Sequence, residues 1–221
     1  MKGSAVINKL IIIGAGGHAT SVYGVAVACG YEVFSFVDLQ PEIGELCGIP
    51  VLNDIEPFMT DSNFDFSIAV GANFSRERIY PEMNGRVAID RFPGLFHPSS
   101  TLSPNSSIGY GTVVMANSTV GVGTTIGQFC LVNSAASIDH TCRMSDYSSL
   151  APGCTVGGDV VLGLRSALSI GSIVKNSITI GDDTVIGAAS YVNKPIGDAV
   201  VAYGVPARVV RQRNVTDSYL N

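Results

Sequence analysis

The sequence is short of basic clusters and of long apolar runs, and each shortage excludes a class of protein. The 221 residues carry a net charge of −5, and lysine and arginine nowhere form a run of three. The basic surface that a nucleic-acid-binding protein needs is therefore missing. No apolar run reaches the roughly 18 residues that a membrane span requires, and the N-terminal segment lacks a secretory cleavage pattern. We expect a cytoplasmic protein that neither binds nucleic acid nor spans a membrane.

Cysteine pairs are missing too. The five cysteines form no CxxC motif and no spacing typical of metal ligands, which predicts free thiols in a reducing compartment, used as small core residues, and no metal site. Hydrophobic residues make up 46% of the chain, enough for a sizeable core in one domain or two. The composition leaves a small-molecule ligand open.

A six-residue period runs through the second half of the chain. From Leu102 to Val192 every sixth residue is aliphatic or methionine, sixteen times in succession. Four residues after each of these positions the chain has a second slot, filled mostly by Ser, Thr, Cys or Ala. Glycine recurs directly after the aliphatic position, where we expect a tight corner that needs a residue without a Cβ atom; it does so at positions 109, 121, 127, 157, 163, 181 and 187.

This period predicts a parallel β-helix. It does not match an α-helix and is too regular for hairpins, but each hexad can supply one side of a triangular prism. Three hexads, or 18 residues, then make one turn, and aliphatic residues stack on their counterparts in the next turn. We expect about five turns with no inserted loop, followed by a short strand or arm and a frayed end.

The N-terminal part follows α/β rules instead. Residues 9–38 read as an apolar strand, a glycine turn, a helix ended by Gly30 and a second strand, which is a βαβ unit. Residues 64–71 predict another buried strand, and residues 73–83 predict a helix. The Pro- and Ser-rich segment 91–107 breaks this rhythm. We therefore predict a small Rossmann-like parallel α/β domain over residues 1–95 and a β-helix domain with a C-terminal arm over residues 96–221.

The glycine turn predicts a nucleotide site. "GAGGHA" (14–19) fits the G-x-G-x-x-A fingerprint, and Asp38 ends the next strand. Gly14 and Gly16 would let backbone N–H groups approach a diphosphate at the helix N-terminus, with Asp38 near a ribose or base. The glycines could also serve only a tight turn, or NAD could be the ligand, and His18 could either touch the ligand or cap the turn.

A single histidine stands out within the hexads. Asp139 and His140 follow Ile138 directly, which places His140 at a corner of the prism with its side chain outside the column. One turn later comes Gly158, whose lack of a side chain leaves room for a substrate carbonyl and an accessible N–H. A base beside an oxyanion donor is what acyl transfer needs. A solvated surface histidine is the alternative.

Three motifs together resemble a known family. The hexads, "GAGGHA" and the closing "AYGVPARVV" (202–210) look like those of the bacterial two-domain sugar acyltransferases of the PglD/NeuD type, over nearly the whole chain from Leu10 to Val210. The resemblance implies a left-handed β-helix, a homotrimer, and acetyl-CoA bound between neighbouring prisms without a metal ion.

The resemblance also implies roles for particular residues. The catalytic group would be His140 as the base, with the backbone of Gly158 as a donor near the thioester. Because Thr141 stands in place of the family's acid, Asp139 is the residue that could orient the ring instead. Acetyl-CoA would contact Gly158, Ser169, Ile170, Gly187, Ala188, Gly204, Pro206 and Arg208. The sugar nucleotide would contact Gly14, Gly16, Gly17, His18, Asp38, Gly71 and Arg76.

At three positions the chain departs from the family pattern. Thr141 stands where an acidic residue commonly follows the base, and Ser149 stands where a second histidine is frequent. Leu39 replaces a second acid after Asp38. These departures leave open what orients the imidazole and which base the nucleotide carries.

We therefore expect an acetyl-CoA-dependent N-acetyltransferase that acts by direct transfer on the amino group of a nucleotide-linked amino sugar, such as a UDP- or GDP-linked 4-amino-4,6-dideoxy sugar. An O-acetyltransferase of the sialic-acid type is the alternative enzyme, because the same base and cofactor would serve a hydroxyl acceptor. A non-catalytic trimeric scaffold or sugar-nucleotide sensor is the alternative outside enzymes.

Overall fold

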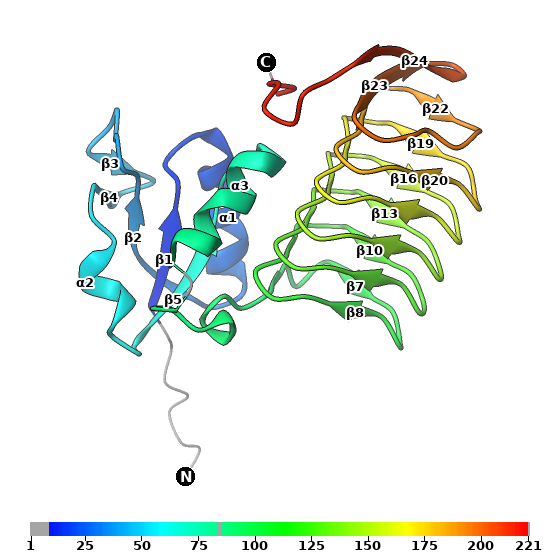
Figure 1. Cartoon of the computed structure of the whole chain (residues 1–221). Coiled ribbons are helices and arrows are strands. Elements are labelled where there is room, and N and C mark those ends of the chain that lie inside the picture. Colours follow the sequence, from blue (N-terminus) through cyan, green and yellow to red (C-terminus); the bar gives the residue numbers. More distant parts are fainter. Residues whose placement is uncertain (1–8, 84, 221) are drawn as a thin grey trace.

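A computed structural model describes residues 9–83 and 85–220 and divides them between a small α/β part and a long triangular prism (Figure 1). The N-terminal segment that lacks a secretory cleavage pattern includes residues 1–8, which lie outside the described residues. Within the described ranges, no helix is long and apolar enough to cross a membrane.

The N-terminal part is a five-stranded sheet in the order β3-β4-β2-β1-β5. Its pairs are parallel except for the hairpin of β3 and β4. The βαβ unit, the strand within 64–71 and the helix at 73–83 are confirmed, whereas α2 and the hairpin were not predicted. The elements are β1 (Lys9–Ile13), α1 (Gly17–Ala28), β2 (Glu32–Val37), β3 (Glu45–Leu46), β4 (Ile49–Leu52), α2 (Glu56–Met59), β5 (Phe64–Ile68), α3 (Asn73–Met83) and the 3-10 helix η1 (Ile89–Arg91).

The second part is the predicted β-helix. Each strand pairs in parallel with the strand 18 residues further on, as when Val120 pairs with Ile138 and Ile138 with Val156. The stacked strands form three sheets of six, five and eight strands, which are the three sides of the prism. The fold class, an α/β domain followed by a left-handed parallel β-helix, is confirmed.

Its strands are β6 (Leu95–Phe96), β7 (Thr101–Leu102), β8 (Ser107–Ile108), β9 (Val113–Val114), β10 (Thr119–Val120), β11 (Thr125–Ile126), β12 (Leu131–Val132), β13 (Ser137–Ile138), β14 (Arg143–Met144), β15 (Ser149–Leu150), β16 (Thr155–Val156), β17 (Val161–Leu162), β18 (Ala167–Leu168), β19 (Ile173–Val174), β20 (Thr179–Ile180), β21 (Val185–Ile186), β22 (Tyr191–Val192), β23 (Val200–Gly204) and β24 (Ala207–Gln212).

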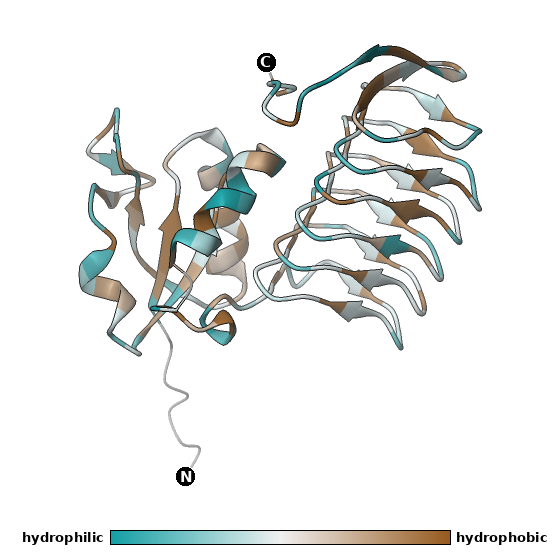
Figure 2. Ribbon diagram, viewed as in Figure 1, coloured by the Kyte–Doolittle hydropathy of each residue, from teal (hydrophilic) through white to brown (hydrophobic). Residues whose placement is uncertain are grey.

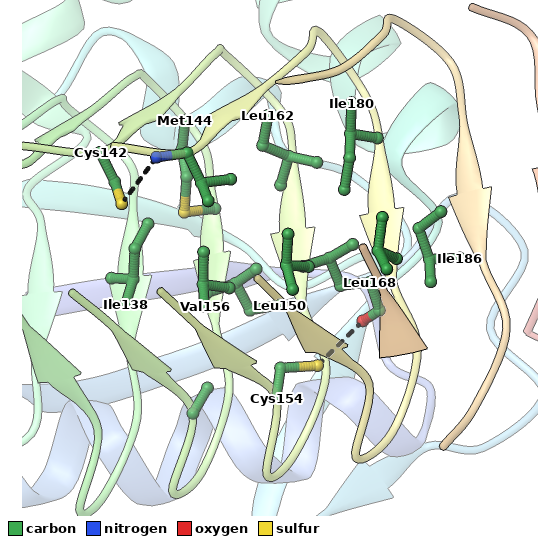
Figure 3. Close-up of a cluster of buried hydrophobic side chains, with 14 of the residues drawn as sticks. Ile138, Cys142, Met144, Leu150, Cys154, Val156, Leu162, Leu168, Ile180 and Ile186 are labelled. Carbon is green, nitrogen blue, oxygen red and sulfur yellow. Dashed lines mark hydrogen bonds between the residues drawn. The ribbon is translucent and has the colours of Figure 1, made fainter. Parts of the chain in front are cut away.

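The aliphatic positions form a continuous column inside the prism (Figure 3). The positions four residues after the aliphatic ones hold small side chains, and many of these donate a hydrogen bond to a backbone carbonyl 15 residues later in the chain. Thr124 Oγ1 donates to the Asp139 carbonyl at 2.6 Å, and Cys142 Sγ donates to the Gly157 carbonyl at 3.1 Å. Burial raises the pKa of the Cys130 thiol to about 11. Cys130, Cys142 and Cys154 are thus buried thiols of the core, as predicted, but the prediction is wrong for Cys47, which is exposed, and Cys29 is only half-buried.

The expected reason for the recurring glycines needs a correction. The left-handed backbone conformation falls two residues later, for example at Asp159 with φ of 59° after Gly157, and at Asp183 with φ of 54° after Gly181. A Cβ atom at Gly109 would lie 2.7 Å from the backbone nitrogen of Gln128, and one at Gly157 would lie 2.8 Å from that of Asn176. These glycines are required because the next turn of the helix packs against them, not because of their own φ.

One side of the prism is covered by the α/β domain. Val113 and Leu131 point outward from the eight-stranded sheet, yet they are buried in one cluster with Leu10 and Val22 of that domain. Figure 2 shows how apolar β1 is, in contrast to the hydrophilic α3. The eight-stranded sheet begins with β6 at Leu95. We keep 1–95 and 96–221 as our proposed division of the chain.

The C-terminal segment is not a frayed end. Strands β23 and β24 form an antiparallel hairpin at the end of the eight-stranded sheet. After it, Arg213 is buried and donates to the carbonyl oxygens of Asp183, Val215 and Asp217. Its guanidinium also lies over the ring of Tyr219. The prediction failed because a tail without periodicity gives no sign of such specific contacts.

Candidate active site

The glycine turn lies between β1 and α1. Gly14 has φ of +112°, and a Cβ atom there would lie 3.0 Å from the Ala69 carbonyl oxygen. Gly16 is the N-cap of α1 without a side-chain cap, and added Cβ atoms at Gly16 and Gly17 would meet open space. An uncapped helix N-terminus beside free space offers N–H groups to an anion.

Asp38 borders a pocket at this turn. Its Oδ2 accepts the N–H of Ala15 at 3.3 Å, and its Oδ1 accepts that of Gln40 at 3.1 Å. The pocket measures about 460 Å³ and is lined by Gly14 and Asp38, by Glu56 and Glu82, and by apolar side chains at α2 and α3. We call it the nucleotide pocket. Sequence reasoning missed its apolar wall because the four-residue helix α2 is too short for a periodic signal; the wall includes Ile55, Met59, Ile79 and Met83.

His18 lies in the first turn of α1, next to Gly71. A Cβ atom at Gly71 would be 3.9 Å from the His18 Cβ atom and 3.1 Å from Leu220 Cδ1. Burial, helped by the charge of Arg76, lowers the pKa of His18 to about 4, so the ring is neutral at pH 7. Its Nε2 atom is buried and finds no hydrogen-bond partner within the described residues. A ligand that bonds to Nε2 would satisfy this atom.

Arg76 is not at the nucleotide pocket. It is buried between the two domains, and five oxygen atoms accept its five N–H donors. The acceptors belong to Phe129 and Tyr147 of the prism and to Val70, Gly71 and Asn73 of the α/β domain, at 2.7–3.0 Å. No donor is left for a substrate. We therefore correct the predicted role of Arg76 from substrate binding to joining the domains.

His140 lies exposed at the corner between the six-stranded and five-stranded sheets, because it links β13 to β14. Its ring covers Gly158, where an added Cβ atom would lie 2.5 Å from Nε2 and 3.0 Å from Nδ1. The structure thus brings His140 and Gly158 together, as the 18-residue turn predicts. Only glycine leaves room for the imidazole at this place.

Asp139 does not hold the ring. Its Oδ1 accepts the backbone N–H of His140 at 2.8 Å. The Nδ1 atom of His140 lies 2.9 Å from Thr141 Oγ1, and this hydroxyl donates to Asp159 Oδ1 at 2.5 Å. The expectation that Asp139 orients the imidazole is corrected, since its carboxylate is used by the backbone of the corner. The sequence analysis noted Thr141 only as a departure from the family pattern and missed its bond to Asp159, although the two residues are 18 positions apart.

A second groove collects the predicted cofactor residues. Ser169, Ile170, Gly187 and Ala188 line a groove of about 520 Å³, together with Tyr219 and other residues of the C-terminal segment. Gly204, Pro206 and Arg208 belong to the hairpin of β23 and β24 and are outside the lining of this groove. We call it the thioester groove.

These features lie at three different corners of the prism. His140 occupies the corner between the six- and five-stranded sheets, and the α/β domain is bonded at the next corner through Phe129, Tyr147 and Arg165. The thioester groove includes Ser169 and Gly187 at the third corner. A side of six extended residues spans up to about 20 Å. His140 lines neither pocket of its own chain.

Comparisons with known proteins agree with this architecture. Residues 9–83 match the family model of the PglD N-terminal domain. The chain is similar to a mutant of perosamine N-acetyltransferase from Caulobacter crescentus in complex with CoA and GDP-perosamine, with 32% identity, a TM-score of 0.87, and coverage of 93% of this chain and 98% of that one. It is equally similar to the acetyltransferase domain of PglB from Neisseria gonorrhoeae in complex with acetyl coenzyme A, with 32% identity, a TM-score of 0.86 and coverage of 92% and 99%.

A shorter match extends to another group of enzymes. Over 65 residues the chain is 43% identical to galactoside O-acetyltransferase of Escherichia coli, which is 29% of this chain and 29% of that protein. The chain thus matches less than a third of the curated relatives' length.

Fold and site together define a two-domain hexapeptide-repeat acyltransferase. Within that class, the chain belongs to the family of bacterial sugar acyltransferases of the PglD/NeuD type.

Proposed function

We propose that the protein transfers the acetyl group of acetyl-CoA to the amino group of a nucleotide-linked amino sugar. The observation that carries the proposal is the imidazole of His140 over Gly158, in a chain that also has a nucleotide pocket and matches, over almost its whole length, an enzyme bound to CoA and GDP-perosamine.

The sugar nucleotide is held by the α/β domain. Its diphosphate lies at the N-terminus of α1, on the backbone of Gly14, Gly16 and Gly17. The nucleoside occupies the nucleotide pocket beside Asp38, whose apolar wall suits the face of a base. The sugar extends toward His18 and Gly71. Support for this placement comes from the unpartnered Nε2 atom of His18.

Acetyl-CoA follows the thioester groove. Main-chain groups of Ser169, Ile170, Gly187 and Ala188 accompany the pantetheine chain along successive turns. The hairpin residues Gly204, Pro206 and Arg208 meet the nucleotide end of the cofactor.

The chemistry is a direct transfer. Nε2 of His140 takes the proton of the attacking amine as the new C–N bond forms, and the C–S bond then breaks to release the coenzyme A thiolate. The N–H of Gly158 donates to the developing oxyanion. Neither step uses a group beyond the two substrates and these residues.

The active assembly is a homotrimer. Since the imidazole and the two pockets lie at different corners of one chain, a neighbouring chain must bring them together. Exposed apolar side chains flank the two corners that would meet, namely Val122 and Val161 beside His140, and Ile170 and Ile173 beside the thioester groove. The five free cysteines fit a reducing compartment, and we place the trimer in the cytoplasm.

An acceptor assay tests the proposal. Release of coenzyme A thiol is measured with UDP- and GDP-linked 4-amino sugars and with matched sugars that carry a hydroxyl at the same carbon. We expect release with an amino sugar only. Release with hydroxyl sugars alone would favour O-acetylation, the activity named for the galactoside O-acetyltransferase relatives. No release with any acceptor would favour the non-catalytic scaffold or sensor.

A further inference from the structure

A chain of two hydrogen bonds links Nδ1 of His140 to a carboxylate in the next turn of the β-helix. Nδ1 lies 2.9 Å from Thr141 Oγ1, and Thr141 Oγ1 lies 2.5 Å from Asp159 Oδ1. Asp139, the nearer acid along the chain, is bonded to the backbone instead. The imidazole therefore contacts a hydroxyl that is itself held by a negative charge.

These two distances determine where the protons lie. A carboxylate can only accept a hydrogen bond, so the hydroxyl of Thr141 must donate its single proton to Asp159. The oxygen of Thr141 can then only accept from the ring, which places a proton on Nδ1 of His140. The neutral imidazole is left with its lone pair on Nε2, which faces Gly158.

The backbone at Thr141 supports a functional reason for this arrangement. Thirteen non-glycine residues among those described have positive φ, and Thr141, at 52°, is the only β-branched one. A β-branched side chain is strongly disfavoured in this region, and such strain concentrates at functional sites. Asp159 has the equivalent corner position one turn later, and its N–H donates to the His140 carbonyl at 3.0 Å, which fixes the register of the three residues.

We propose that Thr141 and Asp159 are positioning residues that together hold His140 as its Nδ1–H tautomer and so keep Nε2 free as the base. The proposal rests on the proposed function for the role of Nε2, but the tautomer itself does not depend on it. Asp159 thereby supplies, from the next turn, the acid that the chain lacks directly after its base.

Nitrogen NMR of histidine-labelled protein tests the tautomer directly. The chain has only three histidines, and His140→Asn identifies the signals of His140. At a pH where the ring is neutral, we expect the Nδ1–H tautomer in the wild type. Thr141→Val keeps the shape of the side chain and removes the hydroxyl, so Nε2–H should increase. Thr141→Ser keeps the hydroxyl and should restore the wild-type pattern. An Nε2–H tautomer in the wild type, or no change in Thr141→Val, would overturn the proposal.

Kinetics provide the second readout. Thr141→Val and Asp159→Asn should each lower kcat by about tenfold to a hundredfold with little change in KM for either substrate, because both side chains act through the imidazole. The double variant should be no slower than Thr141→Val, since both changes interrupt one chain of bonds.

Asp182→Asn is the matched control. Asp182 is likewise an exposed corner aspartate, but its Oδ1 accepts the N–H of Leu164 at another corner. Its kcat should equal that of the wild type. Additive losses in the double variant, or equal losses in Asp182→Asn, would contradict the proposal. If the wild type transfers no acetyl group while the tautomer responds as expected, the proposed function fails and the positioning pair stands.

Discussion

The prism and the α/β domain reach stability in opposite ways. The prism repeats one arrangement, an aliphatic residue over an aliphatic residue with a small polar side chain beside it, so neighbouring turns are nearly interchangeable. In the α/β domain each contact occurs once, as with Arg76 and its five acceptors. The comparison teaches where to look for function in the prism, namely at the few positions that depart from the repeat. His140 and Thr141 are such positions.

The largest effect is expected at His140. His140→Ala should lower kcat by about 10²–10⁴-fold, because general base catalysis contributes on that order. The melting temperature should stay unchanged, since the ring is exposed. Turnover and thermal unfolding are measured side by side. His97→Ala is the control, because His97 is a half-buried histidine away from the proposed site whose Nδ1 atom is likewise bonded to a hydroxyl, that of Ser99. An unchanged rate in His140→Ala would remove His140 from the mechanism.

Arg76 should give the largest effect on stability. Arg76→Met keeps most of the buried volume but leaves carbonyl oxygens of both domains without donors, which should lower the free energy of unfolding by about 2–4 kcal/mol. Urea unfolding followed by circular dichroism measures the loss. Arg78→Met, on the exposed side of α3, should change it by less than about 0.5 kcal/mol. A loss for Arg76→Met as small as this control would mean that the domains do not depend on the arginine.

Within the prism, alanine substitutions at two glycines test whether the ring of His140 needs its present position. Gly158→Ala places a methyl group within 2.5 Å of Nε2 of His140, so the ring must move and kcat should fall by roughly tenfold to a hundredfold. Gly197→Ala is the control, since a Cβ atom there meets nothing within 4 Å. Equal turnover in both variants would show that the ring does not need its present position.

The smallest effect concerns His18 and pH. Its pKa of about 4 in the folded protein lies below the ordinary value of 6.5, so the unfolded chain binds the extra proton. Stability is therefore lost as the pH falls from about 6.5 toward 4, and between pH 7 and pH 5 His18 should account for about 2 kcal/mol. Urea unfolding of His18→Gln at both values should show a smaller loss than the wild type. An identical loss in His18→Gln would contradict the assignment.

The repeat explains why so much of the prism could be predicted. One period dictates the pairing of Val120 with Ile138 and the position of Gly158 beneath the ring of His140, because every turn obeys the same geometry. The βαβ unit could be predicted for a similar reason, since strand and helix periods are local signals.

The unpredicted features depend on contacts between distant segments. Arg76 lies on a helix next to "FDFSIAVG", which suggests a ligand, and only the docked prism reveals its acceptors. The C-terminal tail has no period, so its contact with Asn73 through Tyr219 left no trace in the sequence. Thr141 and Asp159 obey the 18-residue spacing, but nothing local indicates that their side chains would bond.

The separation of the three corners has a genetic consequence. In the trimer we propose, a chain without the imidazole still carries an intact nucleotide pocket, and a chain with a blocked glycine turn still carries an intact His140. A trimer of either chain alone is inactive. A mixed trimer contains an interface at which the intact His140 of one chain meets the intact nucleotide pocket of the other. Two defective alleles expressed in one cell would therefore complement each other, and neither could be classified as a simple loss of function.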